Sequence, residues 1–181
     1  MKKSALEILQ LGHPHLRRTS HVIPDPSDVE FQDFTARLVE FVRQQGGMGI
    51  AAPQVNVASR MFIMSSHPNS RYPTAPIMDA TVVINPEITW TSPEIEKDWE
   101  GCLSLPGIRG LVSRHKKIKV SYLSASGEQI ETEYTDFLAR IFQHELDHLN
   151  GTVFLDRVDS THEIMMEQEW QRRVIDNNEV D

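Results

Sequence analysis

The chain has 181 residues, of which 39% are hydrophobic and 24% are charged, close to the averages of globular proteins. This length fits one ordinary domain that needs no disulfide or metal to fold, so we expect residues 1–181 to form a single domain. The formal charge of −8 argues against non-specific nucleic-acid binding, because phosphates are bound mainly by Lys and Arg.

The sequence also favours an intracellular protein. The single cysteine, Cys102, cannot form an internal disulfide, which fits a reducing compartment. No run approaches the ~20 apolar residues of a membrane span, and the N-terminal stretch lacks the pattern of a signal peptide. We therefore expect no membrane segment.

The first predicted element is a helix over residues 27–45. Ser27 and Glu30 have the spacing of a capping box, which marks the beginning of many helices. The glycine pair at 46–47 is expected to end it. Apolar residues recur at helical period between these ends. They are Phe31, Phe34, Leu38, Phe41 and Val42.

Strands are predicted in the middle of the chain. Runs at 57–64 and 81–84 have strand character, and the three prolines within 65–80 predict a long surface loop between them. Residues 117–123 and 128–134 predict two further strands around a turn at Gly127, the second with alternating apolar and polar residues.

Two helices are predicted after these strands. One covers 136–149 and is closed by Gly151. The other covers about 160–175, with Ser160 and Glu163 at capping-box spacing and an apolar face. That face would contain Met166, Trp170 and Val174. The strands form a block rather than alternating with helices, which predicts the α+β class.

The strongest chemical signal is the segment HELDH at 144–148. On a helix, His144 and His148 lie on one face, so both imidazoles can bind one metal ion. Glu145 would then lie close to a water held by that metal. The alternative is two chance histidines on a surface helix. However, this helix is otherwise apolar, and burying two His and a Glu without partners costs roughly several kcal/mol.

The identity of a third ligand decides the class of metal site, because hydrolytic sites usually have three protein ligands and one open position. The metzincin pattern would require a His at position 154, which is Phe154. A thermolysin-type site would take Glu167 or Glu169, at about the right distance downstream. Cys102, within EGCLS at 100–104, offers a thiolate instead. The residues by themselves leave these two alternatives open.

A third segment, GMGIAAPQ at 47–54, has small residues that would let the backbone approach a ligand closely. Its Gln54 could offer a side-chain N–H donor. Taken by itself, the segment is more typical of a helix end followed by a loop.

In this order, the segments GMGIAAPQ, EGCLS and QHELDH resemble the three motifs of the peptide deformylase family, from about residue 7 to 158. The resemblance implies antiparallel or mixed sheets packed around the HExxH helix, with an N-terminal and a C-terminal helix. It implies a hydrolase that removes the N-formyl group from the N-terminal formylmethionine of newly made polypeptides and releases formate.

The resemblance also implies roles for individual residues. The metal ligands would be Cys102, His144 and His148. Glu145 would be the general base and acid, while Gln54 and the backbone N–H of Leu103 would form the oxyanion hole. One divalent metal is expected, Fe(II) physiologically, with Ni, Co or Zn as other occupants. Sequence does not choose among them, since the ligand set suits several metals.

Five residues are expected to contact the peptide by the same resemblance. Phe137 and Ile141 would line an apolar pocket for the methionine side chain. Met48 and Gly49 would offer backbone groups to the extended peptide, in the manner of strand addition. Arg109 falls where bacterial members carry an Arg near the substrate backbone.

The partners implied are formylmethionyl nascent peptides in a bacterial cytoplasm. Residues 160–181 hold two Arg and six acidic residues, so docking near the ribosome through a basic C-terminal helix is not expected. The sequence leaves open a zinc endopeptidase, a non-enzymatic metal-binding relative and an enzyme for other acylated amines. The oligomeric state, the native metal and the role of the 65–80 loop stay open too.

Overall fold

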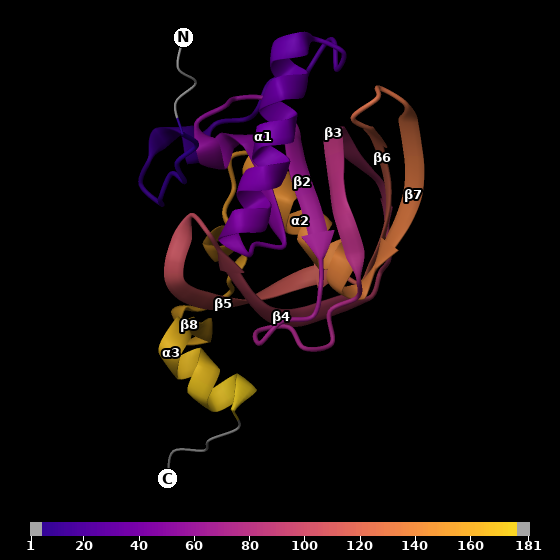
Figure 1. Cartoon of the computed structure of the whole chain (residues 1–181). Coiled ribbons are helices and arrows are strands. Elements are labelled where there is room, and N and C mark those ends of the chain that lie inside the picture. Colours follow the sequence, from indigo (N-terminus) through magenta and orange to yellow (C-terminus); the bar gives the residue numbers. More distant parts are fainter. Residues whose placement is uncertain (1–4, 177–181) are drawn as a thin grey trace.

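Two antiparallel sheets and two long helices make up most of the part of the chain that the computed structural model describes, residues 5–176 (Figure 1). The helices are α1 (Val29–Gln45), α2 (Asp136–Leu149) and the short α3 (Glu167–Trp170). The strands are β1 (Gly49–Ala51), β2 (Met61–Ser66), β3 (Met78–Thr91), β4 (Ile95–Cys102), β5 (Leu105–His115), β6 (Lys117–Leu123), β7 (Gln129–Thr135) and β8 (Ile164–Met166). The other described elements are 3₁₀ turns at Pro14–Arg17, Ala52–Val55, Phe154–Arg157 and Thr161–Glu163, and a π-helical turn at Gln171–Ile175.

The five-stranded sheet has the order β1-β2-β3-β6-β7, and its neighbouring strands are antiparallel. α1 covers one face of it and α2 the other (Figure 1). Alternate side chains of a strand point to opposite faces, so Met61 and Ile63 of β2 pack in the α1 core, whereas Phe62 and Met64 pack in the α2 core. β2 is apolar on both faces because both are buried.

Helix α1 begins at Val29, because Asp28 and not Ser27 is its N-cap. The Asp28 carboxylate accepts a hydrogen bond from the Phe31 N–H at 2.9 Å, while the Ser27 hydroxyl donates to Asp25. The predicted end is confirmed, since Gly46 caps the helix with a left-handed φ of 63°.

The first two strands were predicted with the wrong ends. β2 begins at Met61, since residues 57–60 precede the sheet, and β3 covers far more than 81–84. β3 continues past Asn85, which takes a φ of 50° at an irregularity in the register. The Asn85 side chain exchanges hydrogen bonds with the Ile23 backbone, which holds this irregularity in place. The loop between the strands is consequently 67–77, shorter than the predicted 65–80.

The later strands and the metal helix were predicted closely. β6 has the predicted bounds, β7 begins one residue late, and Gly127 takes a φ of 81° in the turn between them. α2 covers the predicted residues 136–149. Gly151 follows it with a φ of 74° and donates to the His148 carbonyl, as a residue after a helix C-cap does.

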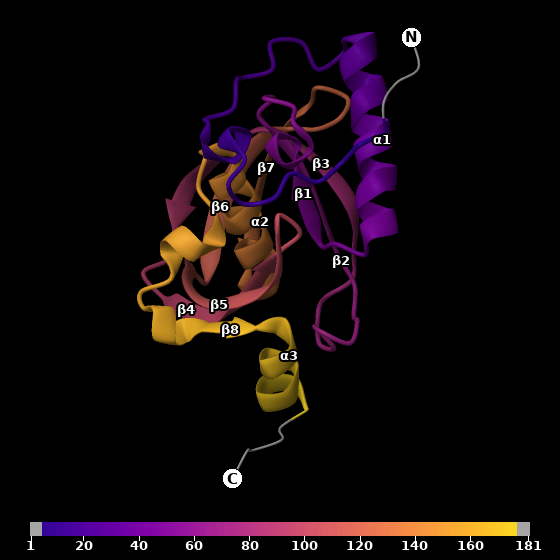
Figure 2. The ribbon, with the colours of Figure 1, turned by 90° about the vertical axis from the view of Figure 1, so that its left-hand side faces the viewer.

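The three-stranded sheet has the order β4-β5-β8, and the predicted C-terminal helix is partly wrong. Ser160 caps a 3₁₀ turn, and residues 164–166 then pair with the edge of β5 (Figure 2). This edge offers unpaired backbone groups, which the third strand satisfies. The helix starts only at Glu167. Trp170 is buried while Met166 is 61% exposed, so the two do not share an apolar face.

No helix within residues 5–176 is both long and apolar enough to cross a membrane.

Candidate metal centre

Cys102 at the end of β4 lies beside His144 and His148, one turn apart on α2. One ligand atom of each residue lies within 4.8 Å of the others, and Cys102 Sγ is 3.2 Å from His148 Nε2. In the part of the chain that the structure describes, these three residues form the only such group able to hold a metal ion. A thiolate with two imidazoles is a donor set that suits zinc, iron, cobalt and nickel, and it leaves a position open.

The surroundings of the two histidines fit a bound cation. His144 Nδ1 donates to Glu100 Oε2 at 2.8 Å, which turns Nε2 towards the cluster. Burial lowers the pKa of His144, but hydrogen bonds to Cys102 and Glu100 outweigh it and raise that pKa. These partners therefore stabilise positive charge at His144. Burial, followed by the charge of His144, lowers the pKa of His148, which keeps its imidazole in the neutral form that binds metals.

Glu145 lies next to this cluster as a buried carboxyl group. Its Oε2 has no hydrogen-bond partner among the described residues, and it lines the same cavity as Cys102 and His144. A Cβ on Gly49 would stand 2.2 Å from Glu145 Oε1, so only glycine fits opposite it. Burial raises the pKa of Glu145 to about 7, within the range of groups that both take and return protons.

Gln54 is buried with its amide aimed at the cluster. Its Oε1 accepts from the Ala51 N–H at 2.8 Å, which fixes the orientation of the amide. Its Nε2 donates to Ser104 Oγ at 3.1 Å and lies 3.4 Å from Cys102 Sγ. Leu103 lines the cavity between them. A donor side chain is thus held next to the ligand group.

A cavity of about 330 Å³ opens in front of these residues. Its wall contains all five residues predicted to contact a peptide: Met48, Gly49, Arg109, Phe137 and Ile141. His148 does not line it and so lies behind the other two ligands. The arrangement offers a metal-ligand set, an acid/base carboxyl and an amide donor at one cavity of ligand size.

Comparison with known proteins identifies the family. The family model described as polypeptide deformylase matches residues 5–163. The chain belongs to the polypeptide deformylase family. Peptide deformylase 2 of Nostoc sp. (strain PCC 7120) is 47% identical over 177 residues, which cover 98% of this chain and 99% of that protein.

Solved deformylase structures share the fold. The Met-Ala-Ser-bound class I type b peptide deformylase from Acinetobacter baumannii has a TM-score of 0.83 and 39% identity, covering 86% of this chain and 99% of that one. A peptide deformylase from Synechococcus elongatus in complex with actinonin has a TM-score of 0.77 and 31% identity, covering 90% and 84%. The predicted family, the α+β fold and the hydrolase class are confirmed. Deformylases are metal-dependent, in agreement with the ligand group found here.

Sequence reasoning missed the buried ion network that supports this deformylase site. Arg114 of β5 donates to both oxygens of Glu100, at 2.9 and 3.0 Å, and to Asp147 of α2 at 2.6 Å. Burial opposes the charge of Glu100, but Arg114 and the His144 hydrogen bond hold its pKa well below the ordinary value. A signal was present, since Glu100 and Asp147 both lie inside the quoted motifs, and buried carboxylates need partners.

The surroundings of Arg109 were also missed. Arg109 lines the cavity, but its guanidinium already donates to Glu167 and to the Tyr72 hydroxyl, and it lies 4.6 Å from the Trp170 ring. Glu167 is therefore not a metal ligand. Glu169 pairs with Arg172 and is not part of the cluster either. The thermolysin-type alternative is thus wrong for both glutamates.

Proposed function

We propose that this chain hydrolyses the N-formyl group of N-terminal formylmethionine on newly made polypeptides and releases formate. Family membership supports the reaction. One observation carries its assignment to this site: the cysteine and two histidines meet at a cavity where an unpaired, buried Glu145 lies beside them. A purely structural metal site would need no such carboxyl group and would close its fourth position.

We assign one divalent metal ion to Cys102, His144 and His148. When bound, such an ion lowers the pKa of a coordinated water towards neutrality and polarises a carbonyl. Fe(II) is our expectation in the cell, and Ni, Co or Zn in purified protein, since availability as well as affinity decides occupancy. Glu100 keeps His144 in the required orientation through its hydrogen bond to Nδ1.

Glu145 moves the proton. Its carboxylate accepts a proton from the attacking water and then returns it to the nitrogen of the leaving amine. Its free oxygen, Oε2, has no competing partner among the described residues, and Gly49 makes room for the other oxygen because it lacks a Cβ. The product is a peptide with a free N-terminal amine.

Gln54 and the backbone N–H of Leu103 stabilise the negative charge that develops on the formyl oxygen. The Ala51 N–H holds Gln54 Oε1, so that Nε2 points towards Cys102 Sγ and Ser104 Oγ, beside the position that we propose for the formyl oxygen. Preset donors of this kind are worth on the order of 2.7–4 kcal/mol of transition-state stabilisation.

The peptide binds along β1. β1 is an edge strand of the five-stranded sheet, so the outer backbone groups of Gly49 can pair with an extended chain. Met48 precedes β1, and because its carbonyl already accepts from the Ser65 N–H, it would contribute only its own N–H. Phe137 and Ile141 provide apolar wall for the methionine side chain. The partners are then nascent formylmethionyl peptides in a bacterial cytoplasm. Binding near a ribosome would need a surface other than the acidic C-terminal segment.

The test is formate release from formyl-Met-Ala-Ser by protein prepared anaerobically with Fe(II). The matched variant is Glu145→Ala, with metal content measured in both. Release by the wild type that collapses in a variant still holding one metal per chain supports both the reaction and the base. No release by metal-loaded wild type would overturn the proposal for this substrate and favour another acylated amine.

A further inference from the structure

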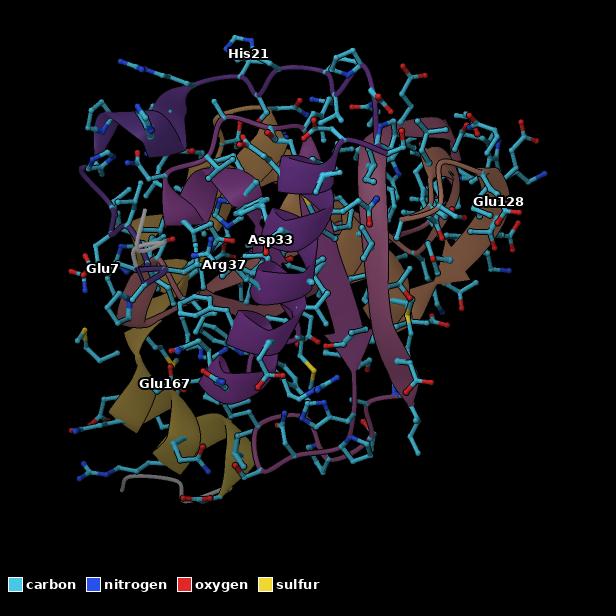
Figure 3. The ribbon with its side chains drawn as sticks, turned by 45° about the horizontal axis from the view of Figure 1, so that its top comes forward. Glu7, His21, Asp33, Arg37, Glu128 and Glu167 are labelled. Atoms are coloured by element: carbon cyan, nitrogen blue, oxygen red, sulfur yellow. The ribbon has the colours of Figure 1, made fainter. Side chains whose placement is uncertain are left out.

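The C-terminal segment supplies one charged residue to the cavity of this deformylase. The family model ends at residue 163, yet Glu167, the first residue of α3, lines the cavity. Figure 3 shows Glu167 where the C-terminal segment meets the body of the molecule. β8 fixes this position, because residues 164–166 pair with Ile108–Gly110 of β5, next to Arg109.

Glu167 and Arg109 form a bidentate ion pair. Arg109 Nε donates to Oε2 at 3.0 Å and Nη2 donates to Oε1 at 2.6 Å, a geometry specific to arginine. The arginine side chain is 3% exposed, whereas the glutamate side chain is 36% exposed. The positive partner is therefore enclosed, and the negative partner stays open to whatever passes the mouth of the cavity.

This pair lies close to the path of the peptide. A Cβ on Gly101 would stand 2.4 Å from Arg109 Nη1, so the guanidinium fills the space beside the residue that precedes Cys102. Without Glu167, an almost uncompensated positive charge would stand there. The remaining acidic residues of the cavity do not neutralise it, because Glu100 pairs with Arg114 and Arg140, and Glu145 is buried near the metal ligands.

We propose that Glu167 is a specificity-determining residue for the peptide residues that follow formylmethionine. By cancelling the charge of Arg109 and presenting a half-exposed carboxylate, it favours substrates with Lys or Arg at one of these positions over substrates with Asp or Glu. The inference rests on the proposed function and adds a charge preference to it. This preference comes from the segment after residue 163, beyond the match to the family model. A chain with a different C-terminal segment would lack the preference.

The test compares Lys with Glu at two positions of the peptide. The substrates are formyl-Met-Xaa-Ala-amide and formyl-Met-Ala-Xaa-amide with Xaa Lys, Gln or Glu. The terminal amide removes a carboxylate that would itself seek Arg109. The readout is the ratio of kcat/KM for Lys to that for Glu. Loss of one charge near a partly solvated peptide residue changes such a ratio by about three- to tenfold.

Glu167→Gln is expected to lower the Lys-to-Glu ratio by that factor at one of the two positions, and added salt should reduce the difference between variant and wild type. The matched control is Glu169→Gln. Glu169 lies on the same helix and pairs with Arg172 and Arg173, but it does not line the cavity. This control should leave the ratio unchanged.

Two outcomes would overturn the inference: an unchanged ratio at both positions, or an equal loss of kcat/KM for Lys, Gln and Glu peptides, which would indicate a structural role only. Binding of the unformylated peptides to zinc-loaded protein, measured by calorimetry, gives the corresponding ratio of dissociation constants without turnover. If no formylated peptide is hydrolysed, the proposed function fails, while the calorimetric ratio still decides the role of Glu167.

Discussion

Strand β5 carries two arginines that each hold a glutamate through Nε and Nη2, and the two pairs differ in burial and in what the glutamate touches next. Arg114 and Glu100 are 6% and 3% exposed, and Glu100 also accepts a hydrogen bond from the candidate metal ligand His144. Arg109 and Glu167 are 3% and 36% exposed, and Glu167 faces the cavity. The same pair chemistry thus orients a candidate metal ligand near the end of the strand and, in our proposal, adjusts the charge of a binding site near its middle.

The energetic consequences of these pairs differ as well. A buried charge that loses its partner cannot be rehydrated, so breaking such a pair destabilises a protein strongly, although the intact pair contributes little net stability. A half-exposed carboxylate that loses its partner turns to water, and the cost is small. Variants of the two pairs should therefore have different effects on the unfolding free energy, on metal affinity and on the preference among peptide substrates.

The largest effect is expected for Arg114→Met. This change leaves Glu100 and Asp147 buried, with Arg140 and Arg157 as their remaining cationic partners. We expect a loss of about 3 kcal/mol or more in the free energy of unfolding, measured by urea denaturation of the metal-free protein. A loss below about 1 kcal/mol would show that water or the remaining arginines compensate the carboxylates.

A smaller but more specific effect is expected for Glu100→Gln. The side chain keeps its shape, but His144 Nδ1 loses its anionic acceptor. Removing the hydrogen-bond acceptor of a metal-binding histidine typically lowers metal affinity by about 10–100-fold, which competition with a zinc chelator would measure. Glu167→Gln is the matched control, because it removes the carboxylate of the other pair and should leave metal affinity unchanged. Equal affinities in all three proteins would contradict the orienting role of Glu100.

Arg109→Met should cost about 1–2 kcal/mol of unfolding free energy, less than Arg114→Met, because Glu167 can turn to solvent. Part of this cost comes from the lost contact with the Trp170 ring and the lost hydrogen bond to the Tyr72 hydroxyl. Thermal and urea unfolding of the two variants under the same conditions give the comparison. Equal losses would mean that exposure of the glutamate does not control the cost.

The sequence predicted the region around the Cys102, His144 and His148 cluster better than the region around Arg109 and Glu167. α2 and the β6–β7 hairpin have strong periodicity and clear turn residues, and their bounds agree with the structure. The three motifs lie on α2, at the end of β4 and around β1, and they contain all three residues of the cluster that could hold a metal ion. Local patterns sufficed there, because the chemistry fixes both residue types and spacing.

The region around Arg109 and Glu167 was missed because it depends on pairing between segments that are distant in the sequence. Residues 164–166 have helical periodicity in isolation, and only the free edge of β5 makes them a strand. β4 was not predicted either, since its first four residues are exposed and three of them are charged. The partnership of Arg109 with Glu167, 58 residues away, has no local signature. Such contacts become visible only when the sheet order is known.

The smallest effect on stability is expected for Glu167→Gln, and this variant best distinguishes the two arginine–glutamate pairs. Glu167→Gln should lower the unfolding free energy by about 1 kcal/mol, less than Arg109→Met, because the amide oxygen of Gln can still accept a hydrogen bond from the enclosed Arg109. It keeps one possible acceptor for Arg109 and leaves the Tyr72 and Trp170 contacts in place. The same variant should nevertheless shift the preference between Lys and Glu peptides. Stability from urea unfolding and selectivity from kcat/KM, measured on one preparation, would separate the two effects. A stability loss as large as that of Arg114→Met would mean that the Arg109–Glu167 pair supports the fold. It would then remove the distinction between the two arginine–glutamate pairs of β5.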